Sequence, residues 1–151
     1  MQEDVLIKKY FYNLNYIVLC EMYLNEYLKP DAIEEKDLKK YNPGHLGTSL
    51  SLNFIQANLN YFLNKNKLTS KTVIGTGHAG VSLISNLWLN GILKDYYPKY
   101  SLDKNGLNNL IKDFGETIRS EINPEYPETI YDGGELGYSL GVAYGYAINT
   151  E

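Results

Sequence analysis

The segment KTVIGTGHAG, residues 71–80, is the stretch that indicates the fold. It opens with β-branched residues and runs into closely spaced glycines, and an apolar stretch follows it. A short strand that passes through a glycine loop into a helix is typical of α/β domains, which gather ligand contacts in such loops. We therefore predict a strand at 71–74, a loop at 75–80 and a helix from there through Leu93.

Outward from this segment, helical patterns alternate with chain breakers. Apolar residues recur every three or four positions over 5–28 and again over 51–63, which predicts two amphipathic helices. Pro30 ends the first of them. The shorter elements are a helical turn or two at 32–41, a weaker helix at 106–114 and an extended loop with two prolines at 118–131.

The C-terminal part, residues 135–148, is apolar and rich in small residues, with Gly137, Gly141 and Gly145 four positions apart. One face of a helix there is bare backbone, which lets another helix or a ligand approach closely. Tight helix packing is the simpler interpretation. We predict one domain, residues 1–151, of α/β class: helix-rich, with a short parallel sheet, and ending where a further strand is expected.

Composition and charge exclude several classes of protein. The 151 residues carry a net charge of −4 and no long cationic run, which argues against a nucleic-acid binder. No apolar run is long enough to span a bilayer, and no secretory signal is evident. The single cysteine, Cys20, excludes an intrachain disulfide and is expected to be a buried, inert thiol. These features favour the cytoplasm.

Both histidines of the chain stand in the same setting. His45 and His78 each lie in a G-H-x-G loop. Flanking glycines let the backbone approach a ligand, and an imidazole can donate a hydrogen bond or move a proton near neutral pH. A zinc site is disfavoured because no third ligand has helical spacing to either histidine, so we predict no metal bound by this chain. A third feature, DGGELG at 132–137, brings two glycines to the start of a helix.

In order and spacing, these elements resemble the N-terminal part of phosphoketolases over nearly the whole chain. GHLGT (44–48) followed by LNFI (52–55) resembles the family's GHWGT…LNF, and GTGHAG resembles its GPGHGG loop. The stretch from PEYP (124–127) through GGELGYSL (133–140) to AYG (143–145) resembles PETPGS…EGGELGYAL and its continuation.

The resemblance implies a function. Phosphoketolases use thiamine diphosphate and Mg²⁺, are related to transketolase, and cleave a ketose phosphate with phosphate to give acetyl phosphate. His45 and His78 match the family's active-site histidines, which contact the donor sugar and the cofactor-bound intermediate. Gly134, Glu135, Leu136 and Gly137, together with His78, match residues that lie against the cofactor. The cofactor supplies the carbanion chemistry, and the protein supplies orientation and proton transfer.

The chain departs from the family's pattern at three positions and in its extent. A third family histidine is matched by Glu121, whose carboxylate would repel a phosphate or enediolate, which argues against the usual sugar-phosphate donor. Leu46 replaces a tryptophan and Thr76 a proline. The family's G-D-G…N metal-binding segment would follow residue 151, so we expect the chain to be truncated before it.

Three functions remain open. The leading one is the N-terminal part, or subunit, of a phosphoketolase-like enzyme whose remaining active site lies on a second polypeptide, or on another copy in a homodimer. The second is transketolase-type two-carbon transfer by a split enzyme. The third is a non-catalytic remnant or interaction subunit. In each case the isolated chain is expected to bind no thiamine diphosphate tightly, because the Mg²⁺ ligands are missing.

Overall fold

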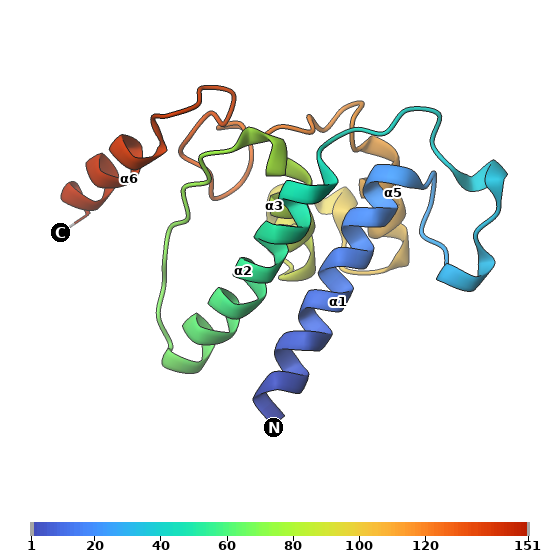
Figure 1. Ribbon diagram of the computed structural model, residues 1–151, viewed down its shortest axis with the longest axis horizontal. Helices are drawn as coiled ribbons and strands as arrows, with labels where there is room; N and C mark the ends of the chain where they lie inside the picture. Colours follow the sequence, from blue (N-terminus) through green and yellow to red (C-terminus); the bar gives the residue numbers. More distant parts are fainter. Residues whose placement is uncertain (1, 151) are drawn as a thin grey trace.

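The computed structural model describes residues 2–150, and they form helices joined by long irregular segments (Figure 1). Two long helices lie side by side, α1 (Gln2–Tyr23) and α2 (Leu46–Asn66). The others are α3 (Gly80–Leu89), α4 (Leu93–Tyr96), α5 (Lys104–Asp113) and α6 (Ser139–Ile148). Single 3₁₀ turns occur at η1 (Pro30–Ala32), η2 (Glu35–Asp37), η3 (Gly77–Ala79) and η4 (Pro98–Tyr100).

The predicted parallel sheet is wrong: residues 2–150 contain no strand, and their fold class is mostly helical. The segment 71–74, predicted as a strand, is irregular. A strand exists only where a neighbour completes its hydrogen-bond ladder. The described residues offer only two isolated bridges, Leu24 with Leu38 and Phe114 with Ile118. Of the β-branched residues in 71–74, Ile74 instead packs against the hydrophobic core.

The helix predictions hold with shifted ends. The first helix ends at Tyr23 rather than near residue 28, and the second spans Leu46–Asn66 rather than 51–63. The helix expected to reach Leu93 stops at Leu89, where Asn90 and Gly91 turn the chain and Gly91 adopts φ +73°. Glycine takes that left-handed conformation without a steric penalty, which is why it ends helices so often.

The hydrophobic core lies between α1, α3 and α5. Its fully buried members include Leu14 and Val18 from α1, Ile84 from α3, and Leu110 and Ile111 from α5. Cys20 is buried in the same cluster, as predicted, and burial raises the pKa of its thiol to about 11. The thiolate, which is the reactive form, is therefore suppressed at neutral pH.

One acidic side chain sits inside this core, and a partly buried lysine lies near it. The Glu21 carboxylate is completely buried, and burial raises its pKa to about 8, against the opposing effects of a hydrogen bond from Ser85 and the charge of Lys39. The Lys39 ammonium donates to the carbonyls of Glu21, Ile111 and Phe114. These carbonyls lie near the C-terminal ends of α1 and α5, where a positive charge is favoured. Lys39 thereby ties the two helices together.

The last helix, α6, lies apart from this body in Figure 1. None of its ten residues is buried, although its sequence, SLGVAYGYAI, is apolar. Leu140 is 81% exposed and Tyr144 69%. At the start of the helix, the Ser139 hydroxyl lies so close to Gly75 that a Cβ on that glycine would be 2.6 Å from it. Within residues 2–150, including α6, no helix is long and apolar enough to cross a membrane.

Candidate functional site

Three loops meet at one backbone junction formed by Gly77, Ile122 and Gly133. The Gly77 amide donates to the Gly133 carbonyl at 3.0 Å, the Ile122 amide to the Gly77 carbonyl at 3.0 Å, and the Gly133 amide to the Ile122 carbonyl at 3.0 Å. Each residue of the junction therefore both donates and accepts. This network joins the Gly77 loop to a segment more than forty residues later in the sequence, and it fixes the side chains next to it.

The glycines are required here by contact between backbones. A Cβ on Gly77 would lie 2.6 Å from the Gly133 carbonyl, and a Cβ on Gly133 would lie 2.4 Å from the Gly77 Cα. Real Cβ atoms do not approach backbone so closely, so neither position accepts a side chain without a shift of the loops. Glycine in this motif thus lets two loops of the chain touch each other.

The two predicted histidines lie together. The imidazoles of His45 and His78 are stacked, with ring centroids 4.1 Å apart and planes at 25°. His45 is the residue before α2, and Gly44, with φ +87°, turns the chain into that position. His78 is in the middle of η3, directly before α3. The starts of two helices therefore bring together residues that are 33 positions apart.

Glu121 joins this pair. Its Oε1 lies 2.8 Å from His78 Nδ1, and both side chains are about half exposed, at 46% and 45%. An ionised carboxylate only accepts hydrogen bonds, so Nδ1 of His78 carries the proton. In the neutral ring the lone pair is then on Nε2, the nitrogen that faces away from Glu121. The carboxylate therefore sets both the orientation and the tautomer of the imidazole.

Residues Gly134, Glu135, Leu136 and Gly137 follow the junction directly, but the structure leaves them on the surface. None of the four is buried. Their turn is held by Asp132, which accepts from the amides of Gly134 and Glu135. Leu136 is 65% exposed, and Gly137 adopts φ +94° before α6 begins. The structure thus joins His45, His78 and Glu121 in one cluster and leaves this loop open to solvent beside it.

Comparison with known protein families identifies the chain. Residues 2–151 match the family described as the XFP N-terminal domain. The chain belongs to the phosphoketolase N-terminal domain family. The motifs that carry the resemblance in the sequence are the ones that build the junction and the histidine pair.

Curated relatives named as phosphoketolases are much longer than the matched segment. The chain is 36% identical to a probable phosphoketolase of Chlorobaculum tepidum over 93% of its own length, and 42% identical to one of Schizosaccharomyces pombe over 75%. It is 37% identical over 92% to a protein of Lactiplantibacillus pentosus named xylulose-5-phosphate phosphoketolase. The matches cover only 14–18% of these three relatives. The chain therefore spans less than a fifth of a phosphoketolase.

The residues of this phosphoketolase domain do not fit the diphosphate end of the family's cofactor. Within residues 2–150 no group of three or more His, Cys, Asp or Glu side chains is placed to hold a metal ion. The charged side chain that contacts His78 is Glu121, an anion, which is unfavourable for a diphosphate without a counter-ion. What the site offers is two imidazoles and a carboxylate, a set suited to hydroxyl groups and proton transfer.

Two features of the site escape sequence reasoning. The Gly77–Gly133 contact is one, because the G-H-x-G setting points equally to a ligand or to another loop. The sequence feature that could have indicated this contact is the glycine pair at 133–134, because two glycine-rich loops can pack closely together. The other is the direct contact between Glu121 and His78. Sequence comparison places Glu121 near the site, but hydrogen bonding between the two requires coordinates.

Proposed function

We propose that the chain is the N-terminal part of a phosphoketolase-like, thiamine diphosphate-dependent enzyme that cleaves a ketose phosphate and forms acetyl phosphate. The observation that carries this proposal is the cluster of His45, His78 and Glu121, assembled from three separate loops. A remnant kept only for its core has no need of two stacked imidazoles with a carboxylate that selects the tautomer of one. Family membership supports the reaction class.

In this proposal the three side chains bind the sugar and move its protons. His78, held with Nδ1 protonated, presents Nε2 as a hydrogen-bond acceptor and base for a donor hydroxyl. The His45 ring stacks against His78. In this proposal His45 binds a neighbouring hydroxyl of the sugar. Glu121 acts through His78, because its carboxylate fixes the tautomer and the orientation of the ring.

The remaining active site lies on a second polypeptide that carries the other phosphoketolase-like domains. Two observations support this arrangement. The chain spans only 14–18% of the relatives quoted above. In addition, α6 and the loop before it expose Leu136, Tyr138, Leu140 and Tyr144, and apolar surface of this extent is typical of an interface. A homodimer through the same face is the competing arrangement, and sedimentation of the chain with and without the second polypeptide distinguishes them.

Thiamine diphosphate and Mg²⁺ bind to the assembly and not to the isolated chain. The diphosphate requires a counter-ion, and the metal ligands are expected outside residues 2–150. Isothermal titration tests this directly: the chain alone should give no heat of binding, and the assembly should bind. Submicromolar affinity of thiamine diphosphate for the chain alone contradicts this part of the proposal.

The catalytic part is tested in the assembly with xylulose 5-phosphate and inorganic phosphate, by measuring acetyl phosphate. Loss of a general acid or base typically costs a factor of about 10²–10⁴ in rate, and we expect that for His78→Gln. Glu121→Gln should cost less and shift the pH profile, because the ring loses its fixed tautomer. Lys8→Gln, an exposed change on α1, is the control. Full activity of His78→Gln and His45→Gln together refutes the catalytic assignment.

The same assay distinguishes phosphorolysis from the alternative, transketolase-type two-carbon transfer. Phosphorolysis requires inorganic phosphate as the acceptor, whereas two-carbon transfer requires an aldehyde. Product formation with an added aldose phosphate and without inorganic phosphate supports transfer. No product under either condition, from an assembly that binds the cofactor, supports a non-catalytic interaction subunit.

A further inference from the structure

Beside the main core, a few apolar side chains form a smaller cluster. Val18, Met22, Val81 and Phe114 are its buried members, and Tyr23, Leu46 and Ile118 pack against them. Three of these residues neighbour the candidate site in sequence: one directly follows His45, one lies three positions after His78, and one lies three positions before Glu121. The cluster therefore contains a residue from each segment that carries a side chain of the site.

Phe114, directly after α5, is the largest fully buried side chain of this cluster. Its ring lies beside the turn that leads to His45, because a Cβ on Gly44 would be 3.8 Å from two of the ring carbons and 3.7 Å from Val81. Atoms at such distances are in van der Waals contact. Gly44 adopts φ +87°, so the direction in which the chain leaves this turn depends on a backbone conformation that the ring supports from one side.

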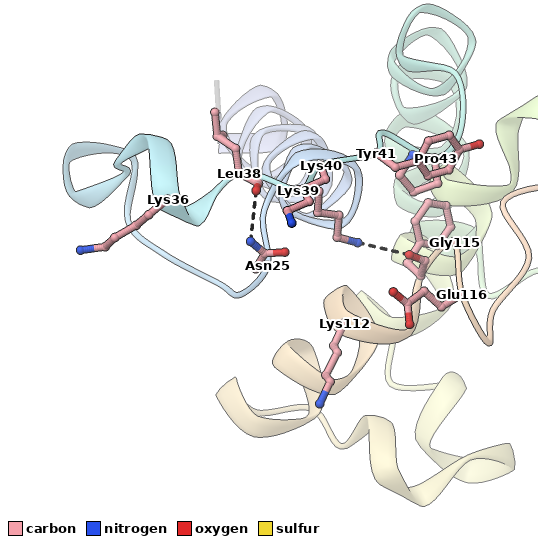
Figure 2. Close-up of a pocket in the computed structure, with 11 residues that line it drawn as sticks. Asn25, Lys36, Leu38, Lys39, Lys40, Tyr41, Pro43, Lys112, Gly115 and Glu116 are labelled. Carbon is pink, nitrogen blue, oxygen red and sulfur yellow. Dashed lines mark hydrogen bonds between the residues drawn. The ribbon is translucent and has the colours of Figure 1, made fainter.

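The next residue, Gly115, contacts the same turn. A Cβ on Gly115 would lie 2.6 Å from both Cβ and Cγ of Pro43, which is buried. The proline ring therefore packs on bare backbone, and no side chain fits between the two. Figure 2 shows Pro43 next to Gly115, and the Lys39 side chain pointing toward them. The Lys39 ammonium donates to the Phe114 carbonyl at 3.2 Å. The segment before α2 is thus attached to the turn after α5 at two places.

The chain after this turn continues to the other histidine. Ser120 lies against Gly80, where a Cβ would be 2.3 Å from the Ser120 carbonyl oxygen. Gly80 is two positions after His78, and Ser120 directly precedes Glu121. Residues 114–121 therefore contact the turns of both histidines, one at each end of the segment.

We propose that residues 114–121 hold the two imidazoles against each other, and that Phe114 and Gly115 are the positioning residues for His45. Both imidazoles are accessible to solvent, and the His78 side chain is 45% exposed. Their stacking at 4.1 Å therefore depends on where the two turns lie, and residues 114–121 contact both turns. The catalytic consequence of this inference rests on the proposed function, whereas the geometry does not.

Proton NMR of the purified chain measures the stacking. The chain has only two histidines, so each Hε1 signal can be assigned with His45→Gln and His78→Gln. The ring current of one imidazole displaces the signal of the ring stacked on it, and His78→Gln removes that displacement from the His45 signal. At a pH where both rings are neutral, Gly115→Ala should move the His45 signal toward its position in His78→Gln, because the new methyl group displaces Pro43.

Gly91→Ala is the matched control. It adds the same methyl group at a similar left-handed position, φ +73° against +86°, but its Cβ would meet only Lys94 and Leu102, at 3.7 and 3.8 Å. It should leave both histidine signals in place. Phe114→Leu retains an apolar side chain and removes the ring without straining the backbone, so it should move the His45 signal in the same direction and gives the result if Gly115→Ala does not fold.

The catalytic consequence is measured in the assembly with xylulose 5-phosphate and inorganic phosphate. Gly115→Ala should lower the formation of acetyl phosphate by up to about 10²-fold, since a small misplacement of a catalytic group can cost about that much. Gly91→Ala should retain the wild-type rate. A moved His45 signal with an unchanged rate in Gly115→Ala overturns this consequence.

Three NMR results overturn the positioning itself. One is a His45 signal that is the same in wild type and His78→Gln, which means that the rings are not stacked. Another is an unmoved signal in Gly115→Ala and Phe114→Leu, each shown to be folded by circular dichroism. The third is an equal movement in Gly91→Ala, which reflects general strain. A moved signal together with full activity of the double variant H45Q/H78Q supports the positioning and refutes the proposed function, so the two failures are distinguishable.

Discussion

Helices α3 and α6 are both ten residues long and both apolar, yet they have opposite environments. In α3, GVSLISNLWL, eight residues are buried, and the helix packs in the centre of the core. In α6, SLGVAYGYAI, none is buried. Both were expected to be helices, and both are. Their sequences predict that both form helices, but they do not predict which helix buries its apolar face among the described residues.

The difference lies in what surrounds each helix. The side chains of α3 meet α1 and α5, whose apolar faces point to the same centre, so Leu83, Ile84 and Leu87 all belong to one cluster. The glycines of α6 meet nothing: no atom lies within 4 Å of a Cβ placed on Gly141 or Gly145. The glycine face of α6 is therefore unoccupied within residues 2–150, and it is open to the proposed second polypeptide.

The largest expected difference between the helices is for truncation of an apolar side chain. Ile84→Ala should lower the free energy of unfolding by about 2–5 kcal/mol, because Ile84 is 1% exposed and its removal leaves a cavity. Leu140→Ala should change it by less than about 0.5 kcal/mol. Urea denaturation followed by tryptophan fluorescence measures both, since Trp88 lies in the core. A large loss in Leu140→Ala would show that α6 is packed in solution.

The second comparison adds one methyl group in each region. Gly133→Ala places a Cβ 2.4 Å from Gly77 Cα and should cost about 1–3 kcal/mol or more, because neither backbone can move without breaking the junction. Gly141→Ala meets open space in a helix and should be neutral or stabilising, since alanine is the better helix former. Thermal unfolding of the two variants in parallel gives the answer. Equal midpoints would mean that the Gly77–Gly133 contact is absent in solution.

The same contrast explains which features of the structure the sequence predicts. Helices with regular apolar spacing, such as α1 and α2, can be predicted because their periodicity is local. The absence of a sheet from residues 2–150 could not be predicted, because 71–74 has strand-like residues and its actual environment depends on distant segments. The histidine pair could be predicted from its two G-H-x-G loops, but the stacking and the Glu121 contact could not. The complete burial of Glu21 could not be predicted, because a charged side chain is normally exposed.

The third prediction concerns pH, to which the core should respond and α6 should not. In the folded chain Glu21 keeps its proton up to a pH of about 8, whereas the unfolded chain loses it near the ordinary value of 4.5. Between these values the folded state binds one proton more, so the contribution of Glu21 to stability is greatest below pH 4.5 and falls as the pH rises toward 8. The slope from this group approaches about 1.4 kcal/mol per pH unit.

Glu21→Gln retains the shape of the protonated carboxyl and removes the titration. Its unfolding free energy should therefore fall less steeply with pH, and the variant should exceed the wild type in stability at pH 8. Glu26→Gln, an exposed change just after α1, is the control and should leave the slope as it is. Urea midpoints at half-unit steps from pH 5 to about 8 measure the slopes. Parallel curves for Glu21→Gln and wild type would contradict the assignment.

The smallest expected effect concerns the first turns of α5 and α6. Asp103 caps α5, because its carboxylate accepts from the Gly106 amide at 2.9 Å, and Tyr138, at the same position of α6, makes no side-chain cap. Asp103→Ala should lower the melting midpoint by a few degrees, since α5 is part of the core and an uncapped amide raises its free energy. Tyr138→Asp should supply α6 with the cap and the favourable charge that it lacks. Its ellipticity at 222 nm should become more negative, while the midpoint monitored by Trp88 stays unchanged. A midpoint that rises together with the helical signal would show that α6 unfolds with the core, and the division of the molecule into a packed body and an unpacked last helix would then be wrong.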